Sequence, residues 1–342
     1  MTRTNVALLG FGNVGRAFVR LLSEKKALLC QRHGIGFDLR AALRSAGGVL
    51  AEAGRDSLDL AGLDREGLAA HPLFRPGLGP EAVFDGLEPG VLVECMSAHP
   101  DTGEPALSVL REAMARGWHV VTASKGPLAA DLCGLRRQAR TKGVVFGFSG
   151  ATGAALPAAD VGLRSLAGAD VTSVQGILNG TTNFVLTRMG EGLDYAGALS
   201  EAQRLGIAEP DPGRDVGGWD SAVKLLILSN LFFDECRKLG DVAVEGISAA
   251  TASEARRAAG RGKKLKLLAR ADRATGRTGL RVGPEALDAR HPLYGVDGAE
   301  KGVSFATDTM GVVTVVGGRS DPRGAAAAML KDIILAYGDR KT

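Results

Sequence analysis

The chain has 342 residues, which is more than one ordinary hydrophobic core accommodates and predicts two domains. Hydrophobic residues make up 45% and charged residues 23%, values typical of globular proteins that exclude the disordered and fibrous classes. The 42 lysines and arginines exceed the 38 acids too little to predict a surface that binds nucleic acid. We therefore expect a folded, soluble chain without a nucleic-acid partner.

The cysteine pattern and the hydropathy pattern favour a cytoplasmic protein. No two cysteines form a Cys-x-x-Cys pair, so neither a zinc cluster nor a disulfide scaffold is indicated. The N-terminal apolar run, 6–9, is shorter than the apolar part of a signal peptide. No other segment approaches the roughly 20 apolar residues of a membrane span. We therefore expect neither export nor membrane insertion. The cysteines are Cys30, Cys95, Cys133 and Cys236.

The first part of the chain alternates strand patterns with helix patterns. This alternation is typical of a doubly wound parallel sheet. Residues 1–150 therefore predict a nucleotide-binding domain of α/β class. The expected strands are 5–9, 37–43, 91–94, 119–122 and 144–148, and the expected helices are 16–29, 104–116 and 127–142.

Beyond residue 150 the composition changes to turns rich in Gly, Ala and Thr between strands and helices. A strand is expected at 171–178 and a long apolar helix at 221–233. We interpret 151–310 as a second domain of α+β class. The last segment, 311–342, contains a helix pattern at 325–337 and is expected to pack back on the first domain.

The stretch 253–277 is basic and rich in alanine, and it includes the lysine run 263–266. A charge run of this kind is usually a solvated face. We interpret it as a solvated helix face leading into a strand and not as a nucleic-acid site.

A Gly-x-Gly-x-x-Gly turn follows the first expected strand and opens the first expected helix. In such a turn the first glycine permits a tight bend, the second admits a pyrophosphate, and the third lets helix and strand pack closely. The pyrophosphate then faces the helix N-terminus. The pattern predicts a Rossmann-type dinucleotide site, although glycine turns can also be plain loops. Its residues are Gly10, Phe11, Gly12, Asn13, Val14 and Gly15.

The end of the second strand indicates which dinucleotide binds. An acid there would bind the ribose of NAD, whereas a base would accept the 2′-phosphate of NADP. The second strand ends at Arg44, while Asp38 lies at its beginning. The pattern favours NADP over NAD, unless Arg44 is an ordinary surface arginine.

Four acids and a lysine lie within residues 209–224. Asp220 and Lys224 are four residues apart at the start of an apolar helix, so their side chains share one face. Oxidation of an alcohol by hydride transfer requires a group that takes the hydroxyl proton, and a lysine can do this. The alternative is an exposed ion pair that contributes about 0.3 to 0.5 kcal/mol.

A second lysine, Lys125, follows the strand 119–122. Ligands of open α/β sheets bind beyond the carboxyl ends of the strands, so Lys125 can meet the substrate or the cofactor. The alternative is a surface lysine that precedes a helix.

The chain resembles homoserine dehydrogenases over nearly its whole length. Five blocks carry the resemblance, of which the last three together are highly specific. They are the glycine turn, Thr-Gly-Glu-Pro-Ala at 102–106, Val-Thr-Ala-Ser-Lys-Gly-Pro-Leu-Ala at 121–129, Gly-Ile-Leu-Asn-Gly-Thr-Thr-Asn-Phe at 176–184, and the acidic loop.

The resemblance implies reversible NAD(P)-dependent interconversion of L-homoserine and L-aspartate 4-semialdehyde, in threonine, methionine and isoleucine biosynthesis. It implies a homodimer whose second domain binds the substrate and forms the dimer. Because the sequence stops near residue 342, we expect no appended kinase or regulatory domain and no threonine feedback through one.

By the same resemblance, Lys224 donates and accepts the proton, and Lys125 lies between substrate and nicotinamide. Glu209 binds the substrate's ammonium group, and Asp215 and Asp220 orient the substrate and the lysine. The remaining implied contacts are Gly180 and Thr181 with the amino acid, and Ser97, Ser124 and Lys125 with the cofactor.

The sequence departs from the family pattern at three places. Ser124 replaces the usual asparagine before the lysine, and the glycine-rich turn at 317–322 is loose. Ser149 replaces a glutamate that helps to hold a monovalent cation, which puts that site in doubt. The matching backbone positions of the cation site are Thr152, Ala154 and Leu156.

Two other interpretations stay open. A related dehydrogenase could use the same groups on another small amino or hydroxy acid, and a nucleotide-binding sensor could lack turnover. The complete acidic loop argues against the former, and the presence of Asp220 and Lys224 argues against the latter.

Overall fold

The computed structural model describes residues 3–52, 57–273, 279–318 and 320–338. The chain divides into two compact units. Unit 1 comprises Met1–Ala155 and Asp321–Thr342, and unit 2 comprises Leu156–Ser320. The sequence analysis places these divisions earlier, after residues 150 and 310. Because the chain leaves unit 1 and later returns to it, unit 2 is an insertion in the sequence of unit 1.

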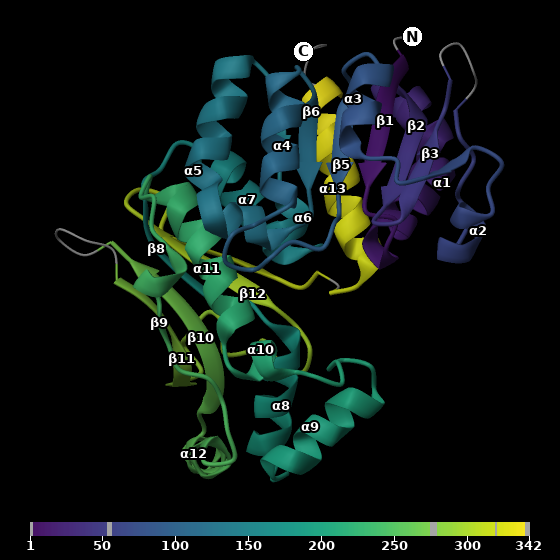
Figure 1. Ribbon diagram of the computed structural model, residues 1–342. Helices are drawn as coiled ribbons and strands as arrows, with labels where there is room; N and C mark the ends of the chain where they lie inside the picture. Colours follow the sequence, from purple (N-terminus) through teal and green to yellow (C-terminus); the bar gives the residue numbers. More distant parts are fainter. Residues whose placement is uncertain (1–2, 53–56, 274–278, 319, 339–342) are drawn as a thin grey trace. The chain divides into compact units, whose positions relative to one another are not determined.

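Unit 1 contains, within its described residues, a seven-stranded sheet in the order β4-β3-β2-β1-β5-β6-β7 (Figure 1). Strands β2, β1, β5, β6 and β7 run parallel, whereas β3 and β4 add an antiparallel edge. The predicted doubly wound sheet is confirmed, and the antiparallel edge is an addition that the sequence analysis lacks. The strands are β1 Arg3–Leu9, β2 Gly36–Arg44, β3 Gly47–Leu50, β4 Phe74–Pro76, β5 Val91–Glu94, β6 His119–Thr122 and β7 Phe146–Gly147.

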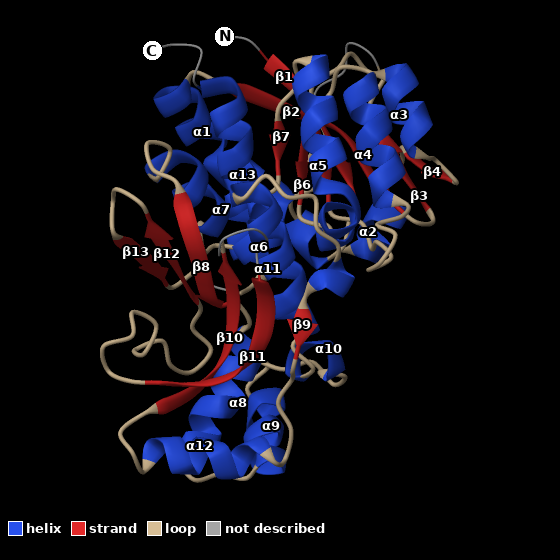
Figure 2. Cartoon of the chain, turned by 90° about the vertical axis from the view of Figure 1, so that its left-hand side faces the viewer, coloured by secondary structure: helices blue, strands red, loops and turns tan. Residues whose placement is uncertain are grey.

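Helices cover both faces of this sheet. Helices α1 and α13 pack together on one face, and α4 and α5 pack together on the other (Figures 1 and 2). Burial on both faces explains why the central strands are continuous apolar runs, such as Val6 to Leu9, which are 0% exposed. The helices are α1 Asn13–His33, α2 Arg65–Ala69, α3 Pro80–Gly86, α4 Ala106–Ala115, α5 Lys125–Lys142, α6 Ser149–Gly153 and α13 Pro322–Gly338.

The last helix, α13, completes the core of unit 1. Met329 and Ile333 are buried in the same cluster as Val6 and Phe18. At the surface, the Arg323 guanidinium donates to both carboxylate oxygens of Glu24 in α1, at 2.6 and 3.1 Å. The C-terminal segment therefore belongs to the nucleotide-binding unit in structure, although it is far from it in sequence.

Unit 2 is built on a six-stranded sheet, counted over its described residues, in the order β13-β12-β8-β10-β11-β9. Neighbouring strands are antiparallel except for β11 and β9. This arrangement is the expected α+β class. The strands are β8 Val171–Ile177, β9 Ala243–Val244, β10 Lys264–Asp272, β11 Gly279–Leu287, β12 Gly302–Thr307 and β13 Val312–Val316.

Helices α8, α11 and α12 pack against β10 of this sheet (Figure 2). The apolar helix α11 buries Leu225 to Leu228 completely, at 0% exposure. The helices of unit 2 are α7 Ala158–Asp160, a π-helix Val161–Ser165, α8 Gly180–Gly190, α9 Tyr195–Arg204, α10 Gly213–Val216, α11 Trp219–Phe232, a 3₁₀ helix Leu239–Asp241 and α12 Thr251–Ala259.

The basic stretch contains the solvated helix face leading into a strand that the sequence predicts, because Arg256 and Arg257 of α12 are exposed. Helix α12 ends at Ala259, and the lysine run begins strand β10. Lys263 is exposed, but Lys266 is only 1% exposed and donates to Asn183 Oδ1 at 3.1 Å and Asp297 Oδ1 at 3.0 Å. Burial lowers the pKa of Lys266, and the Asp297 carboxylate opposes that shift. The burial of Lys266 in the core of unit 2 is a feature that the sequence analysis does not predict.

No helix in the described ranges is long and apolar enough to cross a membrane. Cys30 and Cys95 are not disulfide-bonded.

Candidate active site

The glycine turn brings the start of α1 against the end of β1. Gly10 has φ of 105°, a left-handed conformation that favours glycine, and a Cβ there would lie 2.4 Å from the Cys95 carbonyl. A Cβ on Gly15 would lie 2.1 Å from the Gly10 oxygen. Neither position has room for any side chain, as the motif predicts.

Gly12 differs from the other two glycines, because a Cβ there would meet nothing closer than Arg65 Nη2 at 3.6 Å. Gly12 is also the N-cap of α1, and in the described chain no side chain accepts a hydrogen bond there. The first N–H groups of α1 therefore lack a capping side chain and can bind an anion. This geometry suits a pyrophosphate.

A groove with a volume of about 1020 Å³ opens beside this turn in unit 1. The predicted cofactor residues that line it are Gly10, Phe11, Gly12, Arg44 and Ser97. The other three residues of the motif, Asn13, Val14 and Gly15, form the first turn of α1.

Two arginines meet at one side of the groove. Arg44 ends β2, and its Nη1 donates to the backbone oxygen of Arg65 at 2.8 Å. Both residues line the groove, and Arg65 is a candidate that the sequence analysis does not contain. It follows Arg44 by 21 residues at the start of a short helix, and no motif marks it. Asp38 lies at the other end of β2, beside Asn5, where it pairs with Arg3 at 3.4 Å.

Ser124, predicted to contact the cofactor, is hydrogen-bonded within unit 1. Its Oγ lies 2.8 Å from Glu94 Oε1 and 2.9 Å from the Met96 oxygen. Ser124 is the N-cap of α5, and Lys125 is the first residue of that helix. Lys125 therefore stands directly after the carboxyl end of β6, the place that the sequence predicts for it.

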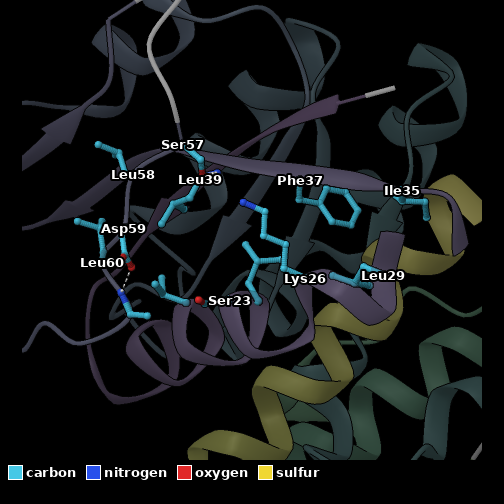
Figure 3. Close-up of a pocket in the computed structure, with 13 residues that line it drawn as sticks. Ser23, Lys26, Leu29, Ile35, Phe37, Leu39, Ser57, Leu58, Asp59 and Leu60 are labelled. Atoms are coloured by element: carbon cyan, nitrogen blue, oxygen red, sulfur yellow. Dashed lines mark hydrogen bonds between the residues drawn. The ribbon is translucent and has the colours of Figure 1, made fainter. Parts of the chain in front are cut away.

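A second cavity of about 230 Å³ lies in unit 1 between α1 and β2. Figure 3 shows the apolar side chains of Leu29, Ile35 and Phe37 around it, with Lys26 and Asp59 at its rim. None of the predicted site residues lines this cavity.

In unit 2 the predicted acids and the lysine form a compact cluster. The Lys224 ammonium donates to Asp220 Oδ2 at 2.6 Å and to the Leu178 backbone oxygen at 2.8 Å. The two side chains are 13% and 11% exposed. The alternative of an exposed surface ion pair is therefore wrong.

Asn179 joins the cluster together, and the sequence analysis gives it no role. Its Nδ2 donates to Asp215 Oδ1 at 2.7 Å and to Asp220 Oδ2 at 2.9 Å. Its Oδ1 accepts from the Thr182 N–H at 2.9 Å, which caps the N-terminus of α8. Asparagine is a preferred N-cap residue, but the sequence analysis predicts no helix after residue 179 and so misses this signal.

The predicted substrate contacts differ in their exposure: Gly180 and Thr181 are buried at the start of α8, whereas Glu209 is exposed. Gly180 begins α8, and a Cβ there would lie 2.6 Å from the Ala299 oxygen. Thr181 is 7% exposed, and its hydroxyl donates to the Ile207 oxygen at 2.9 Å. Glu209 lies exposed in the loop, where its backbone oxygen accepts from Gln203 at 3.3 Å. The described hydrogen bonds thus join Asp215, Asp220 and Lys224 but do not bring in Glu209.

Ser149, which the resemblance aligns with a glutamate of the cation site, is part of an internal polar network. Ser149 N–H and Oγ donate to the two carboxylate oxygens of Asp332, at 2.9 and 2.8 Å. The Lys331 ammonium lies 2.7 Å from Ser149 Oγ. Burial raises the pKa of Asp332, and the nearby Lys331 opposes that shift.

The other predicted cation positions follow Ser149 in and just after α6. Thr152 Oγ1 donates to the Ser149 oxygen at 3.1 Å, Ala154 has φ of 53°, and Leu156 is 1% exposed. Over the described residues, no three acids, histidines or cysteines are grouped to hold a metal ion.

A dinucleotide groove on a doubly wound sheet, together with a buried lysine and carboxylate cluster in the second unit, defines a dinucleotide-dependent oxidoreductase. The homoserine dehydrogenase family model matches residues 157–334. The chain belongs to the homoserine dehydrogenase family, which confirms the resemblance read from the sequence.

The relatives extend over nearly the whole chain. The NAD(+)-dependent homoserine dehydrogenase of Pseudomonas canavaninivorans is 37% identical, over 98% of this chain and 96% of that protein. The homoserine dehydrogenase structure from Thiobacillus denitrificans has a TM-score of 0.81 at 30% identity, over 98% of this chain and 74% of that one. A hyperthermophilic archaeal homoserine dehydrogenase mutant in complex with NADPH is similar in fold, with a TM-score of 0.81, 24% identity and 98% of each chain covered. The present chain is thus an oxidoreductase that acts on a CH–OH group of a small amino-acid substrate and uses a nicotinamide dinucleotide.

Asn179 provides the first test of the cluster. Asn179→Asp places a third carboxylate beside Asp215 and Asp220. Repulsion between the carboxylates should displace Asp220 and, with it, Lys224. Asn179→Ser retains a good N-cap but is too short to bridge the two acids. We expect both variants to lose about 10- to 100-fold in kcat, because small misplacements of a reacting group cost that much. Steady-state kinetics measure this loss, and a melting temperature near wild type for Asn179→Ser shows that the cap survives. Wild-type kcat in Asn179→Ser would contradict a role for the bridge.

Proposed function

We propose that this chain interconverts L-homoserine and L-aspartate 4-semialdehyde, with Lys224 as the group that gives and takes the proton. The observation that carries the proposal is the mostly buried Lys224 ammonium, held by Asp220 and by the Leu178 oxygen. In reduction, a bound nicotinamide dinucleotide would supply the hydride to the aldehyde carbon, and the Lys224 ammonium would donate a proton to the aldehyde oxygen. In oxidation, the neutral amine takes the hydroxyl proton.

Hydrogen bonds in the cluster fix the position of the Lys224 side chain. The Asp220 carboxylate accepts from it at 2.6 Å. Asn179 fixes the direction of that carboxylate by donating to the same oxygen. We therefore propose that Lys224 first polarises the aldehyde and then protonates it, while Asp220 orients the lysine.

The remaining roles concern the substrate's charged ends. We propose that the exposed Glu209 carboxylate binds the substrate ammonium and that Asp215 assists in orienting the substrate. The start of α8, at Gly180 and Thr181, would contact the amino acid. Lys125 would contact substrate and cofactor from the end of β6.

Absorbance of NADPH, and separately of NADH, on mixing with L-aspartate 4-semialdehyde tests the whole proposal. Oxidation that depends on the semialdehyde, with homoserine as product, supports it. Absence of turnover with either dinucleotide would shift the assignment to another small substrate or to a sensor.

Lys224→Ala tests the proton role. We expect kcat to fall by about 10²- to 10⁴-fold, the usual contribution of a general acid or base, while NADPH affinity is retained. Stopped-flow kinetics and a binding titration measure the two quantities. Lys263→Ala, an exposed lysine of the same unit, is the matched control and should behave as wild type. Near-full activity of Lys224→Ala would remove the lysine from the mechanism.

We further propose that the enzyme prefers NADP, with Arg44 and Arg65 binding the 2′-phosphate. Both arginines line the groove at the end of β2, while Asp38 lies at the opposite end of that strand. The Pseudomonas relative is named as NAD(+)-dependent. The preference of this chain therefore has to be tested directly at its two arginines.

Arg44→Ala and Arg65→Ala should each weaken NADPH binding about 10- to 100-fold, because a hydrogen bond to a charged group contributes about 1.5 to 3 kcal/mol. NADH binding should change little, so the ratio of the two dissociation constants is the readout. Arg75→Ala, an exposed arginine of β4 outside the groove, controls for net charge. A wild-type enzyme that binds NADH more tightly than NADPH would contradict the preference.

We propose that catalysis needs no added monovalent cation. The Lys331 ammonium, 2.7 Å from Ser149 Oγ, already supplies a positive charge at the position that the resemblance aligns with the glutamate. Activity in choline chloride should therefore equal activity in potassium or sodium chloride of the same ionic strength. Activity that appears only with potassium or sodium would show that a cation site exists.

A homodimer is proposed on the basis of the edge of the second sheet. Met310, Val312 and Val316 are 51%, 63% and 47% exposed along the hairpin that ends in the edge strand β13. An exposed apolar edge strand is a template for pairing with another chain, and a second copy would cover it. Light scattering in solution measures the mass.

The cytoplasmic location stays a prediction that fractionation of the source cells would test.

A further inference from the structure

Glu94 is a buried acid that the proposed mechanism does not use. It is the last residue of β5, beside Leu9 of β1 and Thr122 of β6 in register. The residue is 0% exposed. Glutamate is almost never fully buried unless its carboxylate is paired, so the position requires an explanation.

Hydrogen bonds to Glu94 come from the segments that leave the sheet after β5 and β6. Oε1 accepts from the Met96 N–H at 2.6 Å and from the Ser124 hydroxyl at 2.8 Å. Oε2 accepts from the Thr122 hydroxyl. Thr122 Oγ1 in turn accepts from the Ser124 N–H at 2.9 Å. One carboxyl group thus joins the first residues of two neighbouring loops.

Each of these loops leads to a part of the proposed site. Cys95, Met96 and Ser97 line the dinucleotide groove. Ser124 caps α5 and directly precedes Lys125. In open α/β sheets ligands bind beyond the carboxyl ends of the strands, where both loops begin. A shift of the carboxyl would move the groove wall and the lysine together.

Because Glu94 is buried, losing any of these hydrogen bonds is costly. Burial raises the pKa of Glu94, and the hydrogen bonds from Thr122, Ser124 and Met96 oppose that shift. A desolvated carboxyl group that loses a donor cannot recover it from water, so the loops cannot rearrange around it without a penalty.

We propose that Glu94 is a positioning residue that holds segments 95–97 and 122–125 in the arrangement that receives the nicotinamide half of the cofactor. This inference rests on the proposed function, because it assigns the groove to the cofactor. It goes beyond that function by naming a residue that touches neither hydride nor proton.

Two variants test the proposal with little change of shape. Glu94→Gln retains an oxygen for Met96 and Ser124 but turns an NH₂ group towards Thr122. Thr122→Val removes the hydroxyl from a side chain of nearly the same size, which is itself 0% exposed. We expect each variant to raise the NADPH dissociation constant and to lower kcat, by about 10- to 100-fold in kcat/KM, as misplaced groups do.

Fluorescence titration of NADPH on the purified full chain gives the binding constant without any need for turnover. If the two residues act as one unit, the double variant should lose scarcely more than either single variant. Glu88→Gln, an exposed acid that precedes β5 at the opposite end of the strand, is the control and should bind NADPH as wild type does.

A Glu94→Gln variant that melts at a lower temperature but keeps wild-type NADPH affinity and kcat would overturn the proposal, because a purely structural role predicts that result. If Glu94→Gln does not fold, Thr122→Val decides by the same measurements. A wild-type chain that binds NADPH but does not turn over the semialdehyde would contradict the proposed function, and the titration would still test Glu94.

Discussion

The close contact between the start of α1 and the end of β1 fixes the geometry of unit 1. The Gly10 oxygen and Gly15 leave no room for a side chain, so the helix must begin where the strand ends. The backbone N–H groups of Gly10 and Phe11 donate to Leu43, which draws the end of β2 to the same place. These backbone contacts, and not a flexible side chain, therefore fix the positions of Arg44 and of the groove.

Unit 2 uses a side chain where unit 1 uses glycine. Asn179 caps α8 with its oxygen and holds two acids with its nitrogen, so the start of one helix and the charged start of another are fixed by one amide. Both units thus place polar groups at helix N-termini. The first N–H groups of a helix have no partner within the helix, so a capping side chain or a ligand must accept from them.

Sequence analysis correctly predicted the features that depend on local pattern and short spacing. The strands at 91–94 and 119–122 and the pair Asp220 and Lys224 are of this kind, because alternation and helical spacing are local. Arg65, Glu94 and Lys266 were missed or misread. Their roles depend on partners distant in sequence, such as Asp297 for Lys266, and no periodicity reveals such a pairing.

The return of the chain to unit 1 has a consequence for synthesis on the ribosome. The core around Val6 and Phe18 includes Met329 and Ile333, so it stays incomplete until the last helix has been translated. Unit 2, by contrast, is continuous from Leu156 to Ser320 and can close its own core earlier. Since domains fold as units during synthesis, unit 2 should fold first, and unit 1 should complete its core only after α13 has been synthesised.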